Sequence, residues 1–218
     1  MRILIAGATG LVGQGVLQEC LRDPAVTQVV ALGRRASGQS HAKLTDLVCP
    51  DFADLSAVEE QLRPFDACLY CAGAAPVGTA EAEYRHVTLD LTTHVAQTLG
   101  RLNPDLAFLY ISGAYSDPGS RLMPMRVKGE TEHALAGLPI RTVMLRPGGI
   151  QPVDGVRSPH SALAAVYAVT RPFMDLGVRL LPNMMTTTQR VGRAMLELLR
   201  QSEPPAVVEN AEINRLGA

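Results

Sequence analysis

The sequence predicts an α/β protein: a doubly wound parallel sheet with a small helical cap at its C-terminal end. Three observations support this fold class. Strand-like apolar runs alternate with helical patterns along the chain, and a glycine-rich turn directly follows the first run. Hydrophobic residues make up 47% of the 218 residues and charged residues 19%, which allows a sizeable core. Strand–helix alternation implies parallel strands covered by helices on both faces.

The expected elements follow from apolar runs and their periodicity. The strands are short apolar stretches: Ile3–Ala6, Gln28–Leu32, Leu44–Val48, Ala67–Cys71, Ala107–Ile111 and Arg141–Leu145. Helical spacing predicts helices near 11–22, 55–62, 80–101, 125–136, 160–176 and 187–201. We expect one domain over 1–218, in which residues 150–218 cap the carboxyl edge of the sheet, where ligands bind in open α/β sheets.

The first expected strand runs into a Gly-x-x-Gly-x-x-Gly turn that opens a helix. Backbone N–H groups at a helix start point at an anion, and the helix dipole favours negative charge there. Glycine lets the backbone come close to a phosphate. The turn therefore predicts a diphosphate cradle made of consecutive residues: Gly7, Ala8, Thr9, Gly10, Leu11, Val12 and Gly13.

The end of the second expected strand distinguishes two dinucleotides. An acidic residue there binds the ribose 2′-hydroxyl of NAD, and an arginine accommodates the 2′-phosphate of NADP. This strand ends in Arg34 and Arg35 with no carboxylate nearby, and a guanidinium binds phosphate bidentately. We expect NADP(H), bound by Arg34 first and Arg35 second. The alternative is a pair of solvated arginines.

Composition argues against several other classes of protein. The net charge is −1 and aromatic residues make up 4%, so we expect no nucleic-acid partner. The N-terminal apolar stretch is too short for a signal peptide, and charges interrupt residues 162–181, so we expect no membrane span and a cytoplasmic location. Cys68 and Cys71 are three apart on a strand and point to opposite faces, which predicts free thiols and no metal site.

Several short motifs occur in an order that resembles the extended and atypical short-chain dehydrogenase/reductases, including epimerase-like oxidoreductases and NmrA-type regulators. The motifs are Gly-Ala-Thr-Gly-Leu-Val-Gly at 7–13, Leu-Gly-Arg-Arg at 32–35, Asp51-Phe52, Cys71-Ala72-Gly73, Ile111-Ser112-Gly113, Val127-Lys128-Gly129-Glu130 and Leu145-Arg146-Pro147-Gly148. The resemblance covers residues 1–150 well and the tail poorly. It implies an NAD(P)-binding Rossmann fold.

The resemblance also implies site residues. Asp51 and Phe52 would lie near the adenine, and the segment Cys71, Ala72 and Gly73 would line the cofactor. Pro147 and Gly148 would pass near the nicotinamide. Ser112 would bind the substrate carbonyl, and Lys128 corresponds to the lysine of the family's Tyr-x-x-x-Lys motif and would bind the nicotinamide ribose. From the residues alone, Lys128 is equally a surface lysine paired with Glu132 one turn later.

The chain departs from the family at the tyrosine of that motif, because position 124 is a proline. Proline has no ionisable group, so the usual proton donor is missing. Three explanations stay open. Tyr115, three residues after Ser112, replaces it; water or a carboxylate such as Asp117 carries the proton; or there is no hydride transfer.

Two functions follow from these alternatives. The first is an NADP(H)-binding oxidoreductase or epimerase-like enzyme that acts on a small carbonyl or hydroxyl compound, with Ser112, Lys128 and Tyr115 as candidate catalytic residues. The second is a non-catalytic NADP(H)-binding sensor or regulator of a protein partner, which Pro124 favours. In either case residues 150–218 would form the substrate-side cap. Assembly into a homodimer stays open.

Overall fold

The structure is a computed structural model that describes residues 1–156, 177–178 and 180–218. Within these residues a parallel sheet has the strand order β3-β2-β1-β4-β5-β6-β9. Its strands are β1 (Arg2–Ala6), β2 (Gln28–Gly33), β3 (Leu44–Val48), β4 (Ala67–Tyr70), β5 (Ala107–Ile111), β6 (Arg141–Arg146) and β9 (Val207–Glu209). The expected strands are all present, within one residue at each end.

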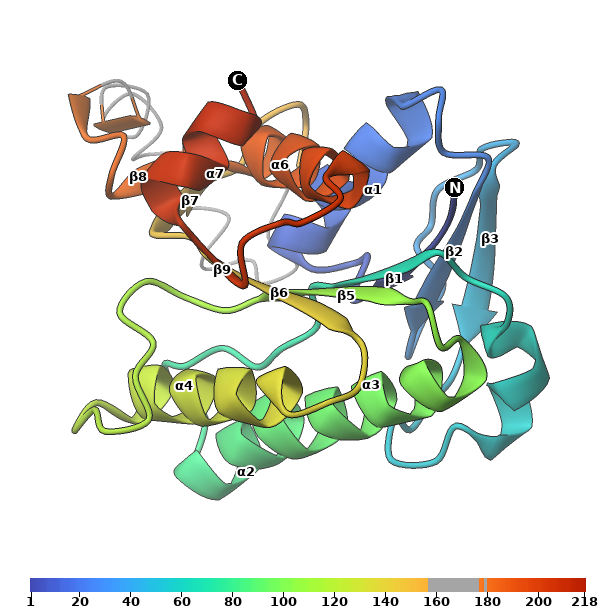
Figure 1. The fold of residues 1–218 in the computed structure, drawn as a ribbon, viewed down its shortest axis with the longest axis horizontal. Helices are drawn as coiled ribbons and strands as arrows, with labels where there is room; N and C mark the ends of the chain where they lie inside the picture. The colour runs from blue at the N-terminus through green and yellow to red at the C-terminus, as the bar shows by residue number, and fades with distance from the viewer. Residues whose placement is uncertain (157–176, 179) are drawn as a thin grey trace.

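Helices cover both faces of this sheet (Figure 1). One layer holds α1 (Leu11–Arg22), α6 (Thr188–Arg200) and α7 (Asn210–Leu216). The other holds α2 (Glu81–Arg85), α3 (Leu91–Leu102) and α4 (Met123–Ala136). A π-helical segment, His86–Asp90, joins α2 to α3, and the expected helix at 55–62 is a 3₁₀ helix, Ser56–Leu62. The doubly wound α/β fold is confirmed.

Strand β1 shows why the sheet lies inside the molecule. Ile3 and Ile5 belong to the apolar core on one face, and Leu4 and Ala6 to the core on the other. All four side chains are completely buried. Alternate residues of a strand face opposite sides, so a strand covered on both faces is apolar throughout. Cys68 and Cys71 likewise contribute to opposite cores, and all the cysteines are free thiols.

The C-terminal part contains elements that the sequence did not predict. β9 extends the sheet beside β6, and β7 (Gly149–Gln151) pairs in parallel with β8 (Met185–Thr187). Strands of three residues are too short to show a period of two. The expected helix at 160–176 lies outside the described residues, and the substrate-side cap stays a prediction.

Helices α1 and α6 pack closely at two glycines. A Cβ at Gly15 would lie 2.6 Å from the Cβ of Thr188, and one at Gly192 would lie 3.0 Å from Cγ of Glu19. The Thr187 hydroxyl caps α6 by accepting a hydrogen bond from Arg190 N at 3.1 Å. Much of the tail after residue 187 thus belongs to the sheet and its helical layer.

Candidate functional site

The turn between β1 and α1 is built from close backbone contacts. Gly7 has φ +83°, a conformation that favours glycine, and a Cβ there would lie 2.6 Å from the backbone N of Ala72. A Cβ at Gly13 would lie 2.1 Å from the Gly7 carbonyl oxygen. Gly10 N donates to that same oxygen at 3.0 Å. The glycines therefore let the turn fold tightly against the end of β4.

The start of α1 is open to an anion. Its N-cap, Gly10, offers no side-chain acceptor, and the first turn carries no acidic residue. The first amide bonded back within the helix is Gln14 N, which donates to Gly10 O at 2.9 Å. The amides of Leu11, Val12 and Gly13 precede it and have no acceptor within the helix. In the turn that precedes the helix, Ala8 is buried and Thr9 is partly buried. These residues fit a diphosphate.

Arg34 and Arg35 follow β2, and both are exposed. Among the described residues neither arginine takes part in an ion pair. Asp46 on the neighbouring strand β3 accepts hydrogen bonds from Ser37 N at 2.9 Å and Ser37 Oγ at 3.2 Å. Both guanidinium groups are therefore available to an anion at the carboxyl end of β2.

The expected cofactor-lining residues follow β3 and β4. Asp51 is exposed and its carboxylate accepts from Ala53 N at 2.8 Å, whereas Phe52 is 8% exposed and belongs to the core. Cys71 N donates to Ala6 O at 2.9 Å, which places Cys71, Ala72 and Gly73 beside the glycine turn. Burial raises the pKa of the Cys71 thiol to about 12, so this thiol stays neutral.

Lys128, on α4, reaches back to the end of β5. Its Nζ donates to Ile111 O at 3.0 Å and to Ser112 O at 2.9 Å, and it lies 5.2 Å from the centre of the Tyr110 ring. Gly113 leaves room for the lysine stem, because a Cβ there would lie 3.3 Å from Lys128 Cδ. Burial lowers the pKa of Lys128 to about 8.

The alternative pairing of Lys128 with Glu132 is wrong. The buried Glu132 carboxylate accepts two hydrogen bonds from Arg146, at 2.9 and 2.5 Å from Nε and Nη2. Arg146 Nη1 also donates to Glu209 at 3.0 Å. A bidentate guanidinium matches a carboxylate better than an ammonium does, so Glu132 pairs with Arg146. Lys128 donates instead to backbone carbonyls at the end of β5.

Ser112 follows β5 and is buried. Its N donates to Leu145 O at 2.8 Å, and its hydroxyl lies 2.9 Å from that of Ser116. Ser116 was not predicted as a site residue from the sequence. Its signal was a second serine four residues after Ser112, in a loop rich in small and polar residues.

Tyr115 lies on the connection from β5 to α4, and Pro124 lies just beyond it, at the start of α4. Tyr115 is 70% exposed and has φ +62°, a conformation that is costly for a residue with a Cβ. In the described part of the chain, no hydrogen bond joins its hydroxyl to Ser112 or Lys128. Pro124 lies in the first turn of α4, where its missing N–H costs nothing. The proline suits the helix start and supplies no proton.

Asn210 supports the segment after β6 and was also missed. Its Oδ1 accepts from Gly148 N at 2.8 Å, and its Nδ2 donates to the carbonyls of Pro182 and Met185 at 2.8 and 3.0 Å. Pro147 O accepts from Ala114 N at 2.9 Å. These bonds join the loops after β5 and β6, so Pro147 and Gly148 lie close to the loop that carries Ser112.

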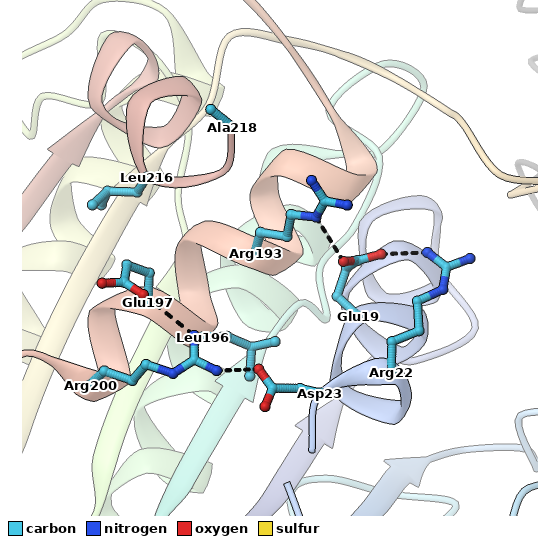
Figure 2. A pocket seen from close by; sticks show the side chains of 9 residues that line it. All are labelled: Glu19, Arg22, Asp23, Arg193, Leu196, Glu197, Arg200, Leu216 and Ala218. Carbon is cyan, nitrogen blue, oxygen red and sulfur yellow. Dashed lines mark hydrogen bonds and ion pairs between the residues drawn. The ribbon is translucent and has the colours of Figure 1, made fainter. Parts of the chain in front are cut away.

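A cavity of about 310 Å³ lies between the C-terminal end of α1 and α6, away from these residues (Figure 2). Its side-chain carboxylates are already paired with arginines, Glu19 with Arg22 and Arg193, and Asp23 with Arg200. The glycine turn lies at the other end of α1, about 18 Å away for a helix of this length. This cavity is an ion-paired seam between helices.

Comparison with known proteins identifies the class. Residues 3–133 match the NAD dependent epimerase/dehydratase family. The chain belongs to this family, which confirms the resemblance to extended short-chain dehydrogenase/reductases and makes the chain one of its NAD(P)-binding Rossmann proteins.

The individual proteins that resemble this chain share about a third of its aligned residues or fewer. The chain is 30% identical over 174 residues to "Protein fmp52, mitochondrial" of Emericella nidulans, which covers 76% of this chain and 74% of that protein. A second fmp52, of Aspergillus fumigatus, is 31% identical over 154 residues, covering 67% and 65%. The fold resembles uronate dehydrogenase from Agrobacterium tumefaciens with TM-score 0.69 at 13% identity, covering 99% of this chain and 82% of that one.

The described residues contain neither a membrane-spanning helix nor a metal-binding cluster. In residues 1–156, 177–178 and 180–218, no helix is long and apolar enough to cross a bilayer. Over the same residues, no group of three or more His, Cys, Asp or Glu side chains is arranged to hold a metal ion.

Proposed function

We propose that the protein is an NADP(H)-dependent oxidoreductase or epimerase-like enzyme that acts on a small carbonyl or hydroxyl compound. The observation that carries the proposal is the contact between Lys128 and the end of β5, where Nζ lies 2.9 Å from the Ser112 carbonyl oxygen. This contact supports a shared site for the two residues although they are 16 positions apart. β5 is the second strand from β1, so the pair lies on the same sheet edge as the glycine turn.

The cofactor half of the proposal rests on the fit of the chain's own groups. The nicotinamide, when bound, supplies or accepts the hydride. The open amides of α1 would hold the diphosphate, and Arg34 and then Arg35 would hold the 2′-phosphate. Asp51 and Phe52 would lie on the adenine side, residues 71–73 along the middle, and Pro147 and Gly148 at the nicotinamide end.

In the proposed reaction, Lys128, Ser112 and Tyr115 each have a separate role. Lys128 uses two of its three N–H groups on the carbonyls of Ile111 and Ser112, which leaves one for the ribose hydroxyls. Ser112 would bind the substrate oxygen. Tyr115 would exchange the proton, and its left-handed backbone supports a functional role, because such strain is concentrated at functional sites.

A second function is favoured by a specific observation. Pro124 fits the first turn of α4 without loss, and the Tyr115 phenol lies mostly in solvent. Both features suit a non-catalytic NADP(H)-binding regulator of a protein partner. The cytoplasmic location and a homodimer also remain predictions, and the fungal relatives are named mitochondrial.

Cofactor choice is tested by dissociation constants for NADPH and NADH. We expect tighter binding of NADPH, because the 2′-phosphate gains a charge-assisted pair with Arg34. Arg34→Ala should weaken NADPH about 10- to 100-fold, equivalent to one such pair, and leave NADH unchanged. The control is Arg101→Ala, which removes an exposed arginine of α3 that pairs with Glu59 of the 3₁₀ helix. Equal affinities in the unaltered protein would refute the choice of NADP(H). NADH is the relevant comparison, because known structures with this fold contain NAD.

Enzyme and regulator are separated by turnover of NADPH against aldehydes, ketones and quinones. We expect turnover with at least one compound, a loss of 100-fold or more in kcat for Lys128→Met, and a similar loss for Tyr115→Phe. Tight NADPH binding without turnover on the whole panel would favour the regulator. Unchanged turnover in Tyr115→Phe would mean that water or Asp117, and not Tyr115, exchanges the proton with the substrate.

A further inference from the structure

The turn that follows Ser112 contains a pair of buried hydroxyls. Ser112 and Ser116 are 4% and 5% exposed, and their Oγ atoms lie 2.9 Å apart. Ser116 Oγ also lies 2.7 Å from the carbonyl oxygen of Gly113, to which Ser116 N donates at 3.3 Å. Ser116 thus closes a tight turn in which Tyr115 has positive φ. The Ser116 hydroxyl lies between the Gly113 carbonyl and the Ser112 hydroxyl.

The direction of these hydrogen bonds follows from the number of hydrogens. A serine hydroxyl has one hydrogen, and a carbonyl oxygen only accepts. Ser116 must therefore give its hydrogen to Gly113 O, because two oxygens at 2.7 Å without a hydrogen between them would repel each other. The hydrogen between the two serines then belongs to Ser112. Lys128 does not change this assignment, since it binds the Ser112 carbonyl oxygen at 2.9 Å.

We propose that Ser116 is a positioning residue that takes the hydrogen of Ser112, so that the site recognises the hydroxyl form of its substrate in preference to the carbonyl form. With its hydrogen engaged, Ser112 Oγ presents lone pairs to a ligand. An alcohol donates its hydrogen to those lone pairs. A carbonyl oxygen has only lone pairs of its own, so the two oxygens repel each other. To donate to a carbonyl, Ser112 must first give up its bond to Ser116. The proposal rests on the proposed function, in which Ser112 binds the substrate oxygen.

Neutron diffraction from deuterium-exchanged crystals of the unaltered protein tests the assignment directly. We expect the Ser112 deuterium between the two Oγ atoms and the Ser116 deuterium on the line to Gly113 O. A Ser116 deuterium that points at Ser112 would overturn the proposal. This measurement needs neither a variant nor a known substrate.

The recognition step is tested with cyclohexanol and cyclohexanone as a matched pair of probes on the NADP(H)-loaded protein. Ligand-observed NMR gives the ratio of their dissociation constants. Ser116→Ala frees the Ser112 hydroxyl, so the preference for the alcohol should fall about fivefold, the effect of one neutral hydrogen bond. Ser116→Thr keeps a hydroxyl and should restore the ratio, and Ser120→Ala in the same loop should leave it unchanged.

The outcomes separate this proposal from the proposed function. A ratio that Ser116→Ala leaves unchanged would overturn the role of Ser116 even where both probes bind and turn over. Failure of either probe to bind or react would instead count against a small carbonyl or hydroxyl substrate, and the neutron result would still decide which serine holds the shared hydrogen.

Discussion

The turn from β1 to α1 and the loop from β5 to α4 are both connections at the carboxyl edge of the sheet, but they are built differently. The first offers backbone amides and is shaped by glycines that pack against Ala72 and Gly7. The second offers side chains, Ser112 and Lys128, which other residues position. A backbone cradle depends on space, whereas a side-chain site depends on partners, so different substitutions should damage them.

The largest effect is expected from filling space in the first region. Gly7→Ala would bring a Cβ to 2.6 Å from Ala72 N, so we expect a loss of about 4 kcal/mol in unfolding free energy and of 100-fold or more in dinucleotide affinity. Gly78→Ala is a matched control, because Gly78 has the same φ of +83° and no neighbour within 4 Å. It should cost about 1 kcal/mol, from the backbone alone. Urea unfolding and dinucleotide titration measure both.

Equal losses in the two variants would contradict this argument. They would mean that positive φ alone accounts for the glycine, and that close contact with the end of β4 is unimportant for the turn.

The contrast between these regions also explains what the sequence could predict. Glycine spacing and Arg34 with Arg35 are local patterns, so the sequence alone marks the β1–α1 turn and the end of β2 as candidate binding segments. The residues that position the second region come from distant parts of the chain. Glu132 meets Arg146 across 14 positions and Asn210 meets Gly148 across 62, and no short pattern records such pairs.

A second substitution tests the side-chain region through the partner of Arg146. Glu132→Gln removes one member of a buried bidentate pair and leaves the guanidinium poorly compensated, so we expect a loss of about 3 kcal/mol. Glu209→Gln removes the exposed partner of the same arginine and should cost less than about 1 kcal/mol. Chemical denaturation of both variants gives the difference. Similar small losses would show that Glu132 is not what keeps the second region in order.

The smallest effect concerns Lys128 and pH. Burial lowers its pKa from 10.5 to about 8, so between these values the folded chain binds fewer protons than the unfolded chain. Stability contributed by this residue therefore rises with pH across that window, by about 2 kcal/mol after allowance for partial exposure. Burial raises the pKa of the Cys20 and Cys71 thiols and of the Tyr70 and Tyr110 phenols, and these shifts change stability with pH in the opposite direction. The rise is therefore measured as the difference between the unaltered protein and Lys128→Met, by urea unfolding from pH 7.5 to 10.5. Parallel curves would mean that Lys128 is solvated in the folded protein. Lys128 would then not be a buried side chain that its partners position at the end of β5.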